Sequence, residues 1–126
     1  MTTKSMLFSC VLVVALVFAT MSARAQDPVK VAPAAFTERL NNANVRVLEY
    51  QSKPGDKEAM HDHARSVIYV MSGGKMRFTA PDGKTNDVEY KTGDVVWRDP
   101  VKHSGENIGT TELHALLVEM KGTKKK

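Results

Sequence analysis

The sequence predicts an all-β domain, built either as a sandwich of two sheets or as a small barrel. Its main support is a series of about seven short segments rich in β-branched and aromatic residues, with turn signals every ~8–12 residues. No helix of crossover length separates these segments, which disfavours a parallel α/β fold. The sequence also contains no long internal repeat and no low-complexity segment, so a single domain is expected.

Residues 26–43 are expected to form an N-terminal arm ahead of the sheets. Two prolines and several alanines between Asp27 and Ala35 favour an extended chain there. Residues 36–41 have the composition of a single helical turn, which the asparagine pair that follows would end. The first strand is therefore expected only after this arm.

Three strands are expected in the first half of the domain. Residues 45–50 alternate between apolar and polar side chains and stop before the turn dipeptide Pro54-Gly55. Residues 58–63 form a second candidate strand. Residues 67–71 form a third, which ends at the Ser-Gly-Gly sequence that follows it.

Four more strands are expected in the second half. Residues 75–80 and 85–90 should pair as a hairpin around the Pro-Asp-Gly-Lys sequence between them. Residues 95–98 follow a second turn, residues 99–102 are expected to be a loop, and residues 112–120 form the last strand.

The first 25 residues have the pattern of a secretory signal peptide. Lys4 provides a positive n-region, residues 6–20 form an apolar h-region, and Ala23-Arg24-Ala25 is a small-x-small cleavage site. Cleavage there would leave Gln26 as the mature N-terminus, in a periplasmic or secreted protein. The alternative is an uncleaved N-terminal anchor.

Composition and charge narrow the possible functions of the mature chain. The only cysteine, Cys10, lies in the predicted signal peptide, so disulfides, thiolate ligands and a thiol nucleophile are excluded. Loss of Lys4 and Arg24 lowers the formal charge from +4 to +2, and the lysine-rich tail at residues 121–126 carries four of the remaining basic residues. The domain at 44–120 is therefore not expected to bind nucleic acid, or a membrane once the signal is removed.

Two histidines, His61 and His63, stand two residues apart in a predicted strand. Side chains two apart in a strand point to the same face, so the two rings should lie roughly 6–7 Å apart, with Asp62 facing away. Two imidazoles at such a distance can reach one metal ion, although an exposed pair on a strand can equally be polar surface.

His103 and His114 are the other histidines of the chain. His103 follows Pro100 in the expected loop, and closure of the sheet would bring it beside the first pair. Three neutral imidazoles facing one cavity suit a divalent transition metal. His114 shares a strand face with three apolar residues, and is either a support or extra ligand for that site or a core histidine bonded to a neighbour. Those three apolar residues are Leu116, Val118 and Met120.

These residues resemble the two sequence motifs of the cupin superfamily. Four positions fit the spacing of the first motif, and four others resemble the second. The resemblance covers residues 44–120 and implies an antiparallel jelly-roll β-barrel. The positions are Gly55, His61, His63 and Gly74 for the first motif, and Gly93, Pro100, His103 and Asn107 for the second.

The chain departs from the family pattern at two places. The second motif is one residue short before His103 and lacks its internal glycine. The glutamate of the first motif should fall at Val67 or Ile68, and counting back from Gly74 assigns it to Val67. Valine cannot coordinate a metal, so the resemblance implies a site of three histidines without the usual carboxylate.

The resemblance implies two kinds of function. Some cupins with three histidines and no glutamate are iron-dependent dioxygenases that cleave diketones or oxidise thiols. The first hypothesis is accordingly an exported, metal-dependent dioxygenase that acts on a small chelating or anionic molecule. The second is a non-catalytic cupin module that binds a small molecule or a metal, and a barrel that holds no metal is a third interpretation.

The expected cofactor is one divalent transition metal. Iron is expected first, with manganese, nickel, zinc or copper as alternatives. Copper is considered because Met60, Met71 and Met76 lie close to the histidines in the sequence, and thioethers suit cuprous ion. Methionine is also a common core residue, which offers a simpler explanation of all three.

Other candidate residues are weaker. Tyr69, two residues after Val67, could face inward as an acid or ligand contact, and Glu106 could act as a base near His103. A homodimer through an outer sheet face is expected by resemblance. Ile68 and Val70 are candidate interface residues, or equally residues packed under the N-terminal arm. The sequence has no nucleophile elbow, phosphate-binding glycine loop or paired carboxylates, which disfavours a serine hydrolase, a nucleotide enzyme and a glycosidase.

Overall fold

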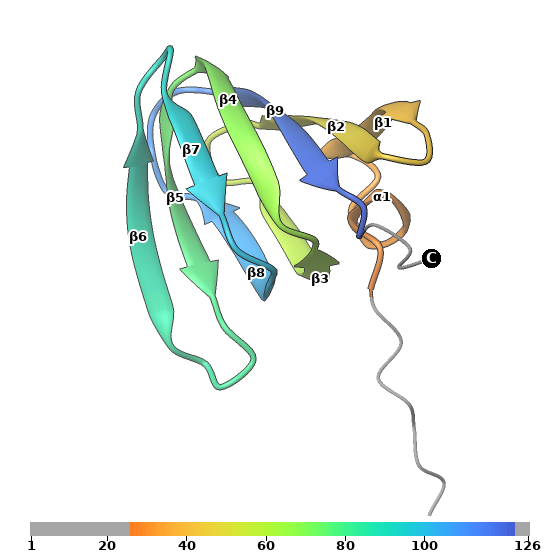
Figure 1. The fold of residues 1–126 in the computed structure, drawn as a ribbon. Helices are drawn as coiled ribbons and strands as arrows, with labels where there is room; N and C mark the ends of the chain where they lie inside the picture. The colour runs from red at the N-terminus through yellow and green to blue at the C-terminus, as the bar shows by residue number, and fades with distance from the viewer. Residues whose placement is uncertain (1–25, 123–126) are drawn as a thin grey trace, which may run out of the picture.

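The computed structural model describes residues 26–122 of the 126-residue chain (Figure 1). The predicted signal peptide and residues 123–126 of the lysine-rich tail lie outside the described residues. Within residues 26–122, no helix is both long and apolar enough to cross a membrane.

The described chain forms one short helix and nine strands in two sheets. In chain order the elements are α1 (Pro28–Val31), β1 (Phe36–Asn41), β2 (Val45–Ser52), β3 (Lys57–His63), β4 (Ser66–Ser72), β5 (Gly74–Thr79), β6 (Thr85–Tyr90), β7 (Val95–Arg98), β8 (Val101–Asn107) and β9 (Leu113–Met120).

The two sheets form the two layers visible in Figure 1. One has the strand order β1-β2-β9-β4-β7 and the other β3-β8-β5-β6, and the paired strands are antiparallel. The space between the layers is filled by buried apolar side chains of both sheets, as expected where one face of each strand is covered. The all-β prediction is therefore confirmed. The buried core between the two sheets includes Leu48, Ile68, Val70, Met76, Leu113, Ala115 and Leu117.

The N-terminal segment differs from its prediction. Residues 36–41 form β1 rather than a helical turn, because they pair along β2 from Phe36 opposite Tyr50 to Asn41 opposite Arg46. Pairing with an existing strand here outweighs a weak local helical preference. The helical turn occurs earlier, in α1, where the side chain of Asp27 accepts a hydrogen bond from the Val29 backbone at 2.9 Å.

The expected loop before His103 is also shorter than predicted. β8 begins at Val101 and pairs with both β3 and β5, so His103 lies within a strand. The loop signal at Pro100 ends at that residue, and the chain then enters the gap between two strands whose backbone groups need partners. β1 and β8 raise the strand count above the seven expected.

The inward and outward faces of β4 are the reverse of those expected. Ser66, Ile68 and Val70 are buried, whereas Tyr69 is 47% exposed on the outer face. Both faces of this strand are apolar, so alternation alone could not assign them. Ile68 rather than Val67 therefore takes the inward position at the place where the first sequence motif would have its glutamate. Ile68 and Val70 are core residues and cannot form a dimer interface on the outer face.

Candidate metal centre

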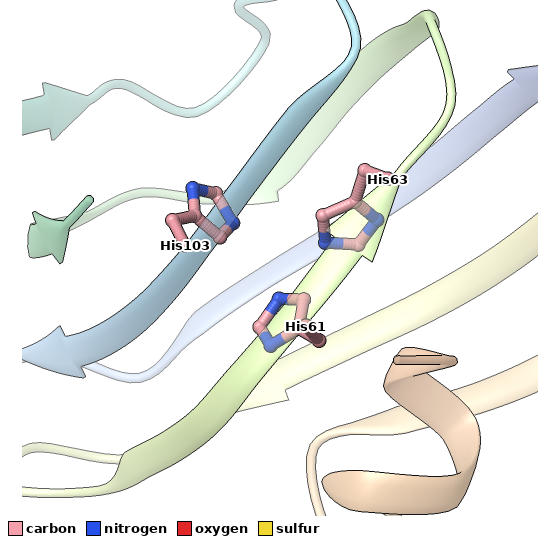
Figure 2. A group of neighbouring side chains, drawn as sticks. All are labelled: His61, His63 and His103. Carbon is pink, nitrogen blue, oxygen red and sulfur yellow. The ribbon is translucent and has the colours of Figure 1, made fainter. Parts of the chain in front are cut away.

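Three histidines from two neighbouring strands meet inside the molecule. His61 and His63 lie on β3 and His103 on β8, where the antiparallel register places His61 directly opposite His103 (Figure 2). The three residues are 1%, 4% and 6% exposed. The two-residue spacing that suggested a shared face for His61 and His63 is thus realised on the inner side of the sheet.

The rings are close enough to surround one ion. Their centroids are 4.7 Å apart for His61 and His63, 5.0 Å for His61 and His103, and 5.5 Å for His63 and His103. One ring nitrogen from each histidine lies within 4.8 Å of the other two. The first distance is shorter than the roughly 6–7 Å expected from ideal strand spacing, and the two ring planes are nearly perpendicular, at 89°. The cluster can therefore accommodate a metal ion.

His61 leaves one ring nitrogen available inside the cluster. Its Nδ1 lies 2.7 Å from the Ala59 carbonyl oxygen, which only accepts, so Nδ1 carries the proton and donates. Nε2 then has a lone pair, and it is buried without a protein hydrogen-bond partner. A buried, unpaired acceptor is unfavourable by itself, and a bound cation would satisfy it.

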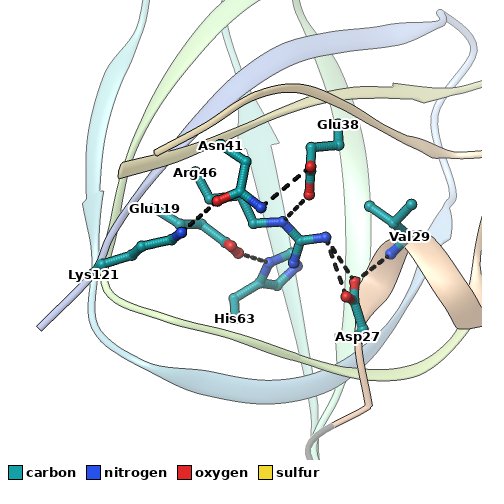
Figure 3. Close-up of polar contacts among 8 residues, drawn as sticks. All are labelled: Asp27, Val29, Glu38, Asn41, Arg46, His63, Glu119 and Lys121. Atoms are coloured by element: carbon teal, nitrogen blue, oxygen red, sulfur yellow. Dashed lines mark hydrogen bonds and ion pairs between the residues drawn. The ribbon is translucent and has the colours of Figure 1, made fainter. Parts of the chain in front are cut away.

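His63 is held from behind by a carboxylate that sequence reasoning missed. Its Nδ1 donates to Oε1 of Glu119 at 2.7 Å (Figure 3), and Glu119 is itself buried on β9. A carboxylate on the outer nitrogen orients the ring and leaves Nε2 as the metal-facing atom. The sequence contained one indication that Glu119 is buried, because in alternating strand positions it falls on the same face as the apolar residues Leu113, Ala115 and Leu117.

Aromatic rings form part of the wall around the histidines. Phe78 stacks on His103 with centroids 4.6 Å apart and an 11° angle between the planes. Phe36 lies 5.1 Å from His61 and 5.4 Å from His63. Because Phe36 begins β1, the segment expected to be an arm contributes directly to the site.

Burial keeps the histidines in the neutral form that binds metals. Desolvation lowers the pKa of His63 to about 2 and that of His103 to about 3, and it also lowers the pKa of His61. The positive charge of Arg98 adds to the lowering at all three rings. Protons therefore do not compete for these ring nitrogens near neutral pH.

The histidines line a partly open cavity of about 30 Å³, and a buried carboxyl group is part of the same lining. The Tyr50 hydroxyl donates to Oε1 of Glu58 at 2.6 Å, and burial raises the pKa of Glu58. Gly105 leaves room for this carboxyl group, because a Cβ at residue 105 would collide with its oxygen. Glu58, bonded by Tyr50, lies in the cavity lining outside the group of three possible ligands.

The remaining predicted site residues lie elsewhere. His114 is on the outer face of β9, where its Nε2 lies 2.7 Å from Oε1 of Glu49. Tyr69 also faces outward and is not part of the cavity lining. Glu106 forms a surface ion pair with Lys57 at 3.6 Å. None of the three is brought to the histidine cluster.

Together, the fold and the site define a small double-layered β-protein with a buried three-histidine cluster. No protein-family model matches the chain, and no curated protein matches its sequence. Solved structures do match. A cupin domain from Bordetella pertussis Tohama I superposes with a TM-score of 0.63 at 26% identity, covering 69% of this chain and 92% of that one.

Two further solved structures are similar at lower identity. An RmlC-like cupin family protein with a double-stranded β-helix fold from Methanocaldococcus jannaschii has a TM-score of 0.54 and 18% identity, covering 68% of this chain and 77% of that one. An uncharacterized conserved protein with a double-stranded β-helix domain from Klebsiella pneumoniae also has a TM-score of 0.54 and 18% identity, covering 85% and 92%. This chain has the double-stranded β-helix fold of the cupin superfamily.

Proposed function

We propose that this protein is a metal-dependent cupin in which His61, His63 and His103 hold one divalent transition metal. The observation that carries this proposal is the convergence of three buried imidazoles, two of which have their outer nitrogens engaged by Ala59 and Glu119. That arrangement leaves neutral nitrogens directed at a common point, which is the donor set of a transition-metal centre.

The activity that we propose is the metal-dependent oxygenation of a small anionic or chelating molecule. Iron is the first candidate metal, since a three-ligand site with open positions suits ferrous oxygenase chemistry, with the metal supplying the binding positions for substrate and oxygen. With Ile68 in the inward position of β4, the cluster lacks a carboxylate ligand. The full charge of the ion would then remain to attract an anion.

The protein itself would contribute orientation and exclusion of water. Glu119 holds the His63 ring by its outer nitrogen, and Phe36 and Phe78 cover the histidine rings. Manganese, nickel and zinc use the same nitrogen donors and remain alternatives. Copper is less supported, because the sulfur of Met76 lies 3.7 Å from the Tyr50 hydroxyl and no methionine is in the described lining of the histidine cavity.

Metal content and oxygen consumption test this proposal directly. Protein purified without an affinity tag should contain close to one divalent metal per chain by elemental analysis, and His103→Ala should lose it. His114→Ala is the matched control and should keep its metal, since His114 is on the outer face. A metal content far below one per chain in the wild type would contradict the proposal.

Oxygen uptake then tests the activity. The iron-loaded protein is mixed with a panel of small carboxylates, diketones and thiols, and uptake is recorded with an oxygen electrode. Uptake with one of these compounds, absent in His103→Ala, is the expected result. A metal-loaded protein that consumes no oxygen with any of them would contradict the proposed oxygenase activity but not the proposed metal centre.

A non-catalytic binding module is the second candidate function. The cavity among the histidines is only about 30 Å³, which is room for about one or two water-sized groups rather than a whole organic substrate. A binding protein would be stabilised against heat by its ligand without any turnover. Differential scanning fluorimetry over the same panel, followed by product analysis, separates the two functions.

Location and assembly stay predictions from the sequence. We propose that the protein is exported and cleaved after Ala25, and mass spectrometry of the cellular form should then find Gln26 at its N-terminus. The expected homodimer would have to use other residues than Ile68 and Val70, such as the exposed Val95 and Trp97 on the outer face. Analytical ultracentrifugation would measure the oligomeric state.

A further inference from the structure

Arg98 is a half-buried arginine that the proposed metal centre does not use. It ends β7, the edge strand of the five-stranded sheet, and lies opposite Ser66 of β4. Trp97 beside it points outward, so Arg98 points between the sheets. Its side chain lines the same cavity as the three histidines.

The charge of Arg98 is not balanced by a protein partner. Its Nε and Nη2 atoms are buried and have no protein hydrogen bond, and the Ser66 hydroxyl opposite it is equally unpaired. Glu119 lies two strands away, in the same row of paired residues across the sheet, but its carboxylate already accepts a hydrogen bond from His63. An arginine keeps its charge at all accessible pH values, so two buried guanidinium nitrogens without a hydrogen bond are unfavourable unless an anion reaches them.

Arg46, in the same row of the sheet, shows how this protein satisfies an arginine that serves the fold. Its guanidinium makes ion pairs with Asp27 at 3.1 Å and with Glu38 at 2.7 Å, as Figure 3 shows. In the part of the chain that the structure describes, Arg98 has no such pair. The contrast indicates that the partner of Arg98 comes from outside the protein.

An open cleft leads from the surface to Arg98. This cleft, of about 340 Å³, shares Phe78, Tyr90, Arg98 and His103 with the histidine cavity, so these four side chains stand between the two spaces. Lys84 and Lys102 contribute further positive charge, and the described lining of the cleft contains no carboxylate. Such a cleft attracts small anions and guides them toward Arg98 and His103.

We propose that Arg98 binds the carboxylate of a small organic acid, which enters through this cleft and lies beside the His103 side of the histidine cluster. A guanidinium forms two parallel hydrogen bonds with a carboxylate, and the Arg98 side chain lines the cleft through which the acid would enter. Phe78, Tyr90 and Val88 provide an apolar wall for the rest of the molecule. The volume suits a compact acid, at the small end of ligand sites. The role of this acid as substrate rests on the proposed function, whereas its binding does not.

The test compares carboxylic acids with their neutral amides. Binding of acetate, propionate and benzoate, and of acetamide, propionamide and benzamide, is measured by ligand-observed NMR on metal-free and zinc-loaded protein. We expect at least one acid to bind the wild type at least about tenfold more tightly than its amide, because a charged hydrogen-bonded pair is lost in the amide. The preference should vanish in Arg98→Gln. Arg77→Gln removes the same charge from an exposed arginine paired with Asp87 at 2.7 Å, and should keep it.

A stability measurement separates ligand binding from a purely structural role. Arg98→Met removes an unpaired buried charge and keeps the apolar bulk, so its melting temperature should equal or exceed that of the wild type while acid binding is lost. A clear drop in melting temperature would show that Arg98 serves the fold, and would overturn the proposal.

Three binding results would also overturn the proposal. The first is equal affinity for acid and amide, and the second is retention of acid binding in Arg98→Gln. The third is that no acid binds at ~10 mM, since a dissociation constant above that concentration is weaker than that of an ordinary specific site. Inorganic phosphate binding as tightly as the best acid would overturn the assignment to a carboxylate. Because the metal-free protein is one arm, a failed metal centre and a failed Arg98 site give different results.

Discussion

Two histidine–glutamate pairs share strand β9 but lie on opposite faces of its sheet. His63 meets Glu119 and His114 meets Glu49, and the closest nitrogen–oxygen distance is 2.7 Å in both. The side chains of the inner pair are 1% and 7% exposed, whereas those of the outer pair are 28% and 25% exposed. The two contacts have the same length, but they use different ring nitrogens, Nδ1 of His63 and Nε2 of His114, and they differ in burial.

The difference shows that a histidine–carboxylate contact does not by itself mark a functional site. The inner pair places the second nitrogen of His63 among two other buried imidazoles, whereas His114 is not part of that group. His114 and Glu119 are five residues apart on β9, an odd spacing that sends them to opposite faces. The role of each pair follows from the face on which its strand position falls.

The largest expected effect is on metal binding when each histidine is removed. His63→Ala should weaken metal affinity by more than about 100-fold, because loss of a ligand should exceed the 10–100-fold cost of losing its supporting partner. His114→Ala should leave the affinity within about twofold, since removal of a part-exposed side chain far from the cluster has little effect. Competition titration with a chromogenic chelator measures both, and an equal loss in the two variants would break the comparison.

The next effect is a loss of stability in acid by the metal-free protein. The pKa of His63 is about 2 and that of His103 about 3 in the folded state, against 6.5 ordinarily. Below pH ~6.5 the unfolded chain binds protons that the folded chain does not, so stability is complete above that pH and falls as the pH drops toward the folded values. Each histidine contributes a slope of about 1.4 kcal/mol per pH unit.

This acid effect has to be measured as a difference between proteins. Burial raises the pKa of Glu58 and Glu119, and their protonation in the folded state opposes the loss at low pH. Urea unfolding of the wild type and of His103→Asn between pH 7 and pH 5 isolates the histidine contribution. The variant should have the shallower pH dependence, and identical curves would show that His103 is not held neutral by burial.

A smaller effect is expected when each glutamate is neutralised. Glu119→Gln should lower metal affinity about 10–100-fold, because His63 loses the carboxylate that orients it and makes it a stronger donor. Glu49→Gln makes the same change in the outer pair and should alter affinity less than about twofold, as expected for an exposed contact. The same chelator titration serves here, and equal effects would mean that burial does not distinguish the pairs.

The smallest effect is expected on the outer face of β4. Tyr69→Phe should change the free energy of unfolding by less than about 0.5 kcal/mol and leave metal binding intact, because the hydroxyl lies on an exposed side chain. Tyr50→Phe is the contrasting inner variant. It removes the donor to the buried Glu58 and should cost about 1–3 kcal/mol in urea unfolding.

The histidine cluster could be anticipated from the sequence because its signals are local. Two histidines at strand spacing fall on one face in any strand, and the motif spacing identified His103 as the third. The partners of these histidines were not predictable in the same way. Glu119 reaches His63 across 56 residues of chain, and only the packing of the two sheets brings β9 to face β3.

The misassigned elements have a common physical cause. Residues 36–41 and 101–107 carry weak local preferences, and their strand form depends on pairing with distant strands. Inner and outer faces were inverted on β4 because Val67 and Tyr69 are as apolar as Ile68 and Val70. Long-range pairing decides such cases, and a single sequence contains little information about it.

The start of the described chain has a consequence for maturation. The backbone nitrogen of Gln26 donates to Oδ2 of Asp62 at 2.6 Å, and Asp62 returns a backbone hydrogen bond to the Gln26 carbonyl at 2.9 Å. On the predicted cleavage after Ala25, that nitrogen changes from an amide to a free ammonium group, and an ionised donor makes a hydrogen bond about twice as strong. Removal of the leader would then strengthen the contact between the N-terminus and Asp62, the residue between His61 and His63.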